Sequence, residues 1–99
     1  KSVITSMKKT SYLINVSRGT VIDEKALINS LKNNKIKGAA LDVFFNEPKI
    51  NPIFKKLNNV ILHPHHGSGT IETRNAMAQL SCMNLINFFK KGKPLHKVI

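Results

Sequence analysis

A short apolar run that ends abruptly in an arginine and a glycine is the feature that most limits how this chain can fold. The run is residues 13–17 (LINVS), and Arg18 and Gly19 follow it directly. Aliphatic and β-branched residues in such a run are typical of a strand covered on both faces. Gly19 permits a sharp turn after Arg18. Because ligands bind at the carboxyl ends of strands in an open α/β sheet, Arg18 is predicted to stand at a binding edge.

The residue type at position 18 adds to this prediction. Of sixteen Lys and Arg residues only Arg18 and Arg74 are arginine, so lysine supplies most of the solubility. The planar fork of an arginine holds a carboxylate with two parallel hydrogen bonds, whereas lysine offers a point charge. Arg18 therefore indicates a carboxylate site, with an ordinary solvent-exposed arginine as the alternative.

The remaining pattern alternates strands and helices. It predicts strands at residues 12–16, 38–45 and 60–62, a helix at residues 24–33, and a long helix from the cap Thr70 to about Lys90. This order indicates parallel strands joined by right-handed crossovers, which is an α/β fold. A parallel sheet needs both faces covered, and the broad apolar face of the long helix also needs a surface to pack against.

Composition bounds the class of protein. A chain of 99 residues forms at most one small domain, which buries somewhat over ~60% of its unfolded surface. No segment approaches the ~20 apolar residues of a membrane span, and no secretory leader opens the sequence, so we expect a soluble protein. The single cysteine, Cys82, excludes an internal disulfide and fits a reducing compartment. Its apolar neighbours predict a small core residue rather than a reactive thiol.

The net charge of +11 raises the alternative of nucleic-acid binding. The lysines are scattered, mostly at predicted helix ends, and aromatic residues are not interleaved with them. This distribution favours a soluble surface with a weak, salt-sensitive attraction to polyanions over a specific nucleic-acid site.

Polar residues follow each predicted strand and should meet at one edge of the sheet. Arg18 follows the first strand, Asp42 and Glu47 lie at and after the second, and His65 follows the third. A carboxylate clamp, a histidine that carries a proton and a carboxylate that favours the charged histidine suit acid–base chemistry on a small oxyacid. Each residue also has a structural interpretation, and for Asp42 it is the satisfaction of local backbone donors.

Four sequence blocks resemble a known family. They are residues 13–19 with 21–27, residues 38–44 with 47–48, residues 59–62 with 64–65, and residues 67–77. The first three are similar to the arginine, glutamate and histidine signatures of the D-isomer-specific 2-hydroxyacid dehydrogenases, and the fourth resembles the glyoxylate and hydroxypyruvate reductase branch. The resemblance implies the second half of a Rossmann-type doubly wound parallel sheet, with residues 1–75 completing an NAD(P)-binding domain. Residues 76–99 would be a linking helix and tail toward the substrate domain.

The same resemblance implies an oxidoreductase that acts on the CH–OH group of small 2-hydroxy acids. Arg18 would bind a 2-oxo acid such as glyoxylate or hydroxypyruvate, His65 would exchange the hydroxyl proton, and Glu47 would hold His65. NAD or NADP would carry the hydride. The residues expected to contact the cofactor are Val16, Ser17, Arg18, Asp42, His65, His66, Gly67 and Ser68. The parent protein would be a cytoplasmic homodimer without a membrane or nucleic-acid partner.

The sequence departs from the family pattern in two respects. His63 stands where the family usually has a small hydroxyl residue, and His66 stands where it usually has an apolar or small one. The Gly-rich phosphate-binding turn is absent, and Gly67-Ser68-Gly69 does not replace it because these residues lie in the histidine turn. We therefore expect a C-terminal fragment that binds cofactor poorly on its own.

Two alternatives remain. One is a metal site built from His63, His65 and His66, although Pro64 disturbs the regular strand that would align their rings. The other is a non-catalytic remnant that acts through protein contacts or weak polyanion binding.

Overall fold

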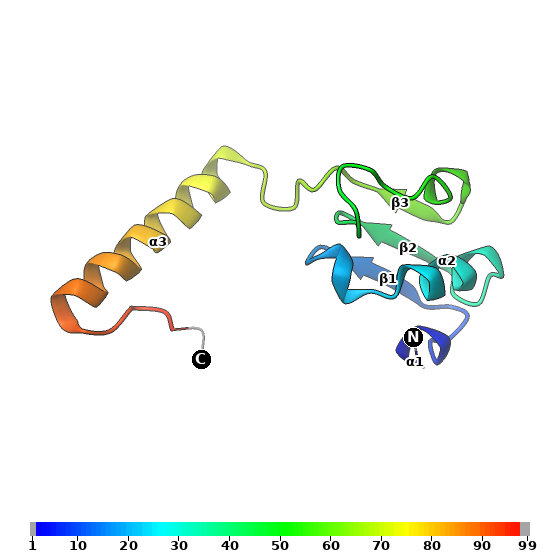
Figure 1. Ribbon diagram of the computed structural model, residues 1–99, viewed down its shortest axis with the longest axis horizontal. Coiled ribbons are helices and arrows are strands. Elements are labelled where there is room, and N and C mark those ends of the chain that lie inside the picture. The colour runs from blue at the N-terminus through cyan, green and yellow to red at the C-terminus, as the bar shows by residue number, and fades with distance from the viewer. Residues whose placement is uncertain (1, 98–99) are drawn as a thin grey trace. The chain divides into compact units, whose positions relative to one another are not determined.

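The computed structural model describes residues 2–97, which pack as two compact units that meet between Gly67 and Ser68 in the sequence (Figure 1). These are units of packing, and the domain boundary expected between residues 75 and 76 stays a prediction.

The first unit is built on a three-stranded parallel sheet. Its strands are β1 (Tyr12–Asn15), β2 (Gly38–Leu41) and β3 (Val60–Leu62), in the order β1-β2-β3. Leu41 pairs with Asn15 on one side and with Leu62 on the other. The predicted parallel α/β arrangement is confirmed, although β1 and β2 end earlier than the apolar runs suggested. The carboxyl ends of all three strands therefore meet at one edge.

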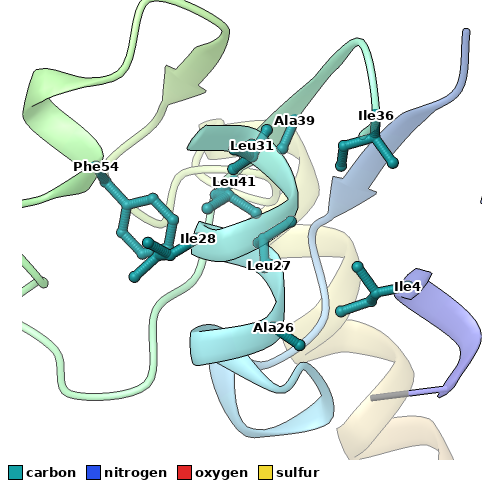
Figure 2. Packing of buried hydrophobic residues seen from close by; sticks show 9 residues of the cluster. All are labelled: Ile4, Ala26, Leu27, Ile28, Leu31, Ile36, Ala39, Leu41 and Phe54. Atoms are coloured by element: carbon teal, nitrogen blue, oxygen red, sulfur yellow. The ribbon is translucent and has the colours of Figure 1, made fainter. Parts of the chain in front are cut away.

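Helix α2 (Glu24–Lys32) connects β1 to β2 and supplies four of the nine side chains of the buried hydrophobic cluster. Its N-cap is Asp23, whose Oδ1 accepts a hydrogen bond from the Ala26 amide at 2.9 Å, as predicted. The helix ends at Asn33, and Asn34 has a φ of 50°. Figure 2 shows the buried side chains of this cluster, which come from α2, from β2 and from segments beside them: Ile4, Ala26, Leu27, Ile28, Leu31, Ile36, Ala39, Leu41 and Phe54.

The opposite face of the sheet is open, contrary to the prediction of strands covered on both faces. Ile14 is 70% exposed and Ile61 is 71% exposed, and Val16 just beyond β1 is exposed as well. The reason is that α1 (Ser2–Thr5) packs on α2 and sends Ile4 into the same core. The two short 3-10 turns, η1 (Gly19–Val21) and η2 (Phe54–Lys56), lie in the loops.

The second unit consists mainly of helix α3 (Ile71–Lys91). Thr70 caps it by accepting a hydrogen bond from the Thr73 amide at 3.2 Å, and Gly92 ends it with a φ of 71°. None of its residues is buried, and the expectation that Cys82 is a core residue is wrong, since its side chain is exposed. Among residues 68–97 there is no second helix or strand against which α3 can bury an apolar face. Among residues 2–97, no helix has the length and apolar character needed to span a membrane.

Candidate active site

His65 and Glu47 form a hydrogen-bonded pair beyond the carboxyl ends of β2 and β3. The His65 Nδ1 lies 2.7 Å from Glu47 Oε2, and the other carboxylate oxygen accepts the Phe44 amide at 2.8 Å. The hydrogen bond from the imidazole is the main cause that lowers the pKa of Glu47 below its usual value. Since an ionised carboxylate only accepts, Nδ1 carries a proton. The Nε2 of His65 has no protein partner within the described part of the chain, and the side chain is half exposed.

Arg18 follows β1 in a turn that a buried asparagine holds. The Asn15 side chain donates to the Arg18 carbonyl at 2.9 Å and accepts the Ser17 amide at 3.1 Å. Asn15 is 5% exposed, so these bonds form in a protected environment. The Arg18 Nη1 donates to the Ser17 carbonyl at 2.7 Å, and the guanidinium charge contributes to the lowered pKa of Glu47. Arg18 thus lies within electrostatic reach of the His65 and Glu47 pair.

Gly19 allows this approach. A Cβ on Gly19 would lie 2.0 Å from the carbonyl carbon of Phe44 and 2.1 Å from its oxygen. Only glycine therefore lets the turn after β1 pack directly on the backbone after β2. The sequence predicted Gly19 as a turn residue, and the structure shows that it is a close-packing residue.

Asp42 directly follows β2, is buried, and accepts three hydrogen bonds. Its Oδ1 lies 2.6 Å from His63 Nδ1 and accepts the His66 amide at 2.8 Å. Its Oδ2 accepts the Gly67 amide at 2.7 Å. The hydrogen bond from His63 is the largest cause that lowers the pKa of Asp42 from 3.8 to about 2. The carboxylate therefore satisfies backbone donors, which was the structural interpretation of Asp42.

Two hollows flank these groups. A pocket of about 440 Å³ is lined by both members of the His65 and Glu47 pair, by His63 and by Lys55. An apolar groove of about 160 Å³ on the open face of the sheet is lined by Ile14, Val16, Ala40, Leu41, Asp42, Ile61, His63 and Gly67. Only His63 lines both hollows. The surface that lines the groove is apolar, and the Asp42 carboxylate is already bonded to His63, His66 and Gly67, so the groove suits an apolar or aromatic group.

The predicted cofactor residues fall into groups. Val16, Asp42 and Gly67 line the groove, whereas His65 lines the pocket. The His66 amide donates a hydrogen bond to Asp42. The His66 ring lies edge-on to the His63 ring, with 5.8 Å between the ring centroids. Ser17 stays in the turn before Arg18, and Ser68 is the first residue of the second unit.

The alternative of a histidine metal site is not supported. The Nδ1 atoms of His63 and His65 bond to two different carboxylates. Within residues 2–97, no three His, Cys, Asp or Glu side chains are placed to hold a metal ion.

Sequence comparison identifies the family. Residues 1–67 match the family described as D-isomer specific 2-hydroxyacid dehydrogenase, NAD binding domain. The chain belongs to the D-isomer specific 2-hydroxyacid dehydrogenases. The resemblance predicted from the sequence blocks is therefore confirmed.

Relatives of this 2-hydroxyacid dehydrogenase chain are longer than the chain itself. It is 46% identical over 99 residues to a 2-ketogluconate reductase of Gluconobacter oxydans (strain 621H), covering 100% of this chain and 32% of that protein. An NADPH-dependent glyoxylate/hydroxypyruvate reductase of Sinorhizobium meliloti, solved with NADP and malonate, is 43% identical with a TM-score of 0.83, over 97% of this chain and 30% of that chain. A 2-hydroxyacid dehydrogenase of Ketogulonicigenium vulgare Y25 is 50% identical with a TM-score of 0.77, over 96% and 30% respectively. The chain thus spans about a third of the length of these relatives.

Sequence reasoning missed two residues of this candidate site. Asn15 was treated as part of an apolar run, yet its side chain organises the Arg18 turn. His63 was considered as a departure from the family pattern and as a possible metal ligand, yet it pairs with Asp42. A polar residue inside an apolar run, directly before a turn, was the available signal for Asn15.

Proposed function

We propose that the chain is part of an NAD(P)-dependent 2-hydroxyacid dehydrogenase that reduces glyoxylate, hydroxypyruvate or a similar small 2-oxo acid, with His65 as the acid and base. The observation that carries the proposal is the 2.7 Å bond between His65 Nδ1 and Glu47 Oε2. The similarity to reductases of 2-oxo acids supports the substrate class.

His65 would supply the proton for reduction of the carbonyl group. Glu47 fixes the ring with Nδ1 protonated, so Nε2 is the nitrogen that faces the substrate. A protonated His65 would donate its Nε2 proton to the carbonyl oxygen, which becomes the hydroxyl group, and would return to the neutral form. In the oxidative direction the neutral ring would accept that proton.

Arg18 would orient the substrate. The carboxylate of a 2-oxo acid would accept hydrogen bonds from the guanidinium group, which has donors left beyond the one that bonds to Ser17. The pKa of Glu47 is lowered mainly by its hydrogen bond with His65 and to a small extent by the charge of Arg18, so the two side chains interact electrostatically. This arrangement would place the carbonyl oxygen near His65, and orientation of that kind accounts for much of the rate gain in enzymes.

A nicotinamide cofactor, when bound, supplies the hydride. The residues present fit such a group, because the groove lined by Val16, Asp42 and Gly67 has an apolar surface and a volume of about 160 Å³, which suit an aromatic ring. A side chain at Gly67 would come within 2.9 Å of the Asp42 Oδ2, so glycine keeps this end of the groove open. Ser17, Arg18, His65, His66 and Ser68 complete the proposed set, with either NAD or NADP as cofactor.

The cellular setting is also part of the proposal. We infer a cytoplasmic homodimer, since Cys82 is the only cysteine in the sequence and the family resemblance implies a dimer.

The test is an assay of the full-length protein that carries this sequence, with glyoxylate and hydroxypyruvate and either NADH or NADPH. His65→Gln is expected to lower kcat by about 100- to 10,000-fold because the proton donor is lost. Its cofactor dissociation constant should change little. His96→Gln is the matched control, because His96 lies in the second unit and, among residues 2–97, its backbone amide rather than its ring makes the recorded hydrogen bond. Equal losses of turnover and cofactor binding, or a parent protein that reduces no 2-oxo acid, would refute the proposal.

A further inference from the structure

A second imidazole–carboxylate pair lies beside the His65 and Glu47 pair. His63 Nδ1 lies 2.6 Å from Asp42 Oδ1, and the Asp42 side chain is 6% exposed whereas that of His63 is 56% exposed. The strand register explains the pairing. Leu41 pairs with Leu62, and the His63 amide donates to the Leu41 carbonyl at 2.9 Å, so the next residues of β2 and β3 come together.

The other hydrogen-bond donors to Asp42 link the His63 and Asp42 pair to the turn that carries His65. Besides His63, Asp42 accepts the amides of His66 and Gly67 at 2.8 and 2.7 Å. These two residues directly follow His65, which has a φ of 57°. A left-handed conformation is uncommon for a residue with a side chain and persists where the surroundings hold it. The Asp42 carboxylate is therefore the group that holds the turn on which the His65 ring is mounted.

His63 restricts the Asp42 carboxylate in turn. The Asp42 Oδ1 accepts hydrogen bonds from the His63 ring and from the His66 amide, whereas Oδ2 accepts one from the Gly67 amide. Without the ring, one of the three donors to a buried charge is lost, and the carboxylate can rotate away from the two amides. We propose that His63 is a positioning residue for proton transfer by His65, acting through Asp42 and the turn at residues 65–67.

This inference rests on the proposed function for the role of His65. Whether His63 stabilises the turn at residues 65–67 can be tested without an activity assay. Two variants of the full-length protein distinguish the effect of losing the hydrogen bond to Asp42 from the effect of losing the His63 ring. His63→Asn keeps a side-chain N–H near the position of Nδ1, and His63→Leu has no donor. Hydrogen exchange of the His66 and Gly67 amides is measured without substrate or cofactor. We expect exchange about tenfold faster in His63→Leu and close to the parent rate in His63→Asn, because opening of the turn sets the rate.

The kinetic arm tests the consequence for catalysis. In His63→Leu, kcat for the 2-oxo acid should fall about tenfold or more with KM and the cofactor dissociation constant nearly unchanged, and His63→Asn should restore most of the loss. Unchanged amide exchange in His63→Leu, or equal loss in both variants, would overturn the inference. A loss confined to cofactor affinity would overturn it as well, since His63 also lines the groove.

One measurement needs no substitution and serves if His63→Leu does not fold. Nitrogen-15 NMR of the parent protein should show a proton on His63 Nδ1, and a ring protonated only on Nε2 would overturn the inference. If the parent protein reduces no 2-oxo acid, the proposed function fails, and amide exchange still decides whether His63 holds the turn.

Discussion

Replacing Gly19 with alanine would separate two backbone segments that the site requires to be in contact. The added Cβ would lie 2.0 Å from the carbonyl carbon of Phe44, 2.1 Å from its oxygen and 2.4 Å from the Phe45 nitrogen. All three are backbone atoms, so no side-chain rotation relieves the clash. Ordinary contact begins at 3.4 Å, and the closest pair must therefore move apart by about 1.4 Å (3.4 − 2.0).

This displacement has two expected effects. Overpacking of this kind costs about 1–3 kcal/mol of folding free energy. The Phe44 amide also donates a hydrogen bond to Glu47 at 2.8 Å, so a shift of Phe44 would displace the carboxylate that holds His65. Arg18 precedes Gly19 and would be pushed away from Phe44. A misplacement of about 1 Å in reacting groups can cost about 100-fold in rate. We therefore expect Gly19→Ala to lower kcat/KM for the 2-oxo acid by about that factor.

The assay pairs thermal unfolding with kcat/KM in the full-length protein. Gly38→Ala is the matched control, because its Cβ would meet the Asn59 carbonyl oxygen at 2.8 Å at the amino end of β2, opposite the site. Both variants should unfold at lower temperature, but only Gly19→Ala should lose activity beyond a few-fold. If Gly19→Ala keeps its activity, or Gly38→Ala loses as much, the close approach of the two segments does not matter for catalysis.

Two other predictions follow from the same edge of the sheet. Arg18→Lys keeps the charge but removes the fork, so kcat/KM for the 2-oxo acid should fall about tenfold or more while cofactor affinity holds, and unchanged kinetics would remove Arg18 from the site. The pKa of Asp42 is lowered from 3.8 to about 2, so its contribution to stability is complete above pH 3.8 and is lost as the pH falls toward 2. The free energy of unfolding in urea should depend less on pH in this acid range in Asp42→Asn than in the parent. An equal pH dependence in the two proteins would contradict the lowered pKa of Asp42.

Local signals predicted most of the fold. The cap Asp23 and the apolar stripe that includes Leu27 define α2, and the run at residues 60–62 coincides with β3. These features depend on neighbours within a turn or a strand, which a sequence pattern contains. Burial was predicted less well. Ile14 and Cys82 have core-like sequence surroundings, but burial depends on a covering layer, and the described residues of its own unit provide none for either side chain.

The candidate site shows the same division between local pattern and long-range contact. Arg18, Glu47 and His65 were predicted because each follows a strand, and parallel strands bring their carboxyl ends together. The groups that hold them depend on contacts across strands. Asp42 and His63 are 21 residues apart in the chain and meet only because Leu41 and Leu62 are in register. A histidine in place of a small hydroxyl residue, taken alone, indicated only a more polar pocket. Opposite a buried carboxylate that binds the two amides after His65, the same histidine becomes part of the support for the proposed acid and base.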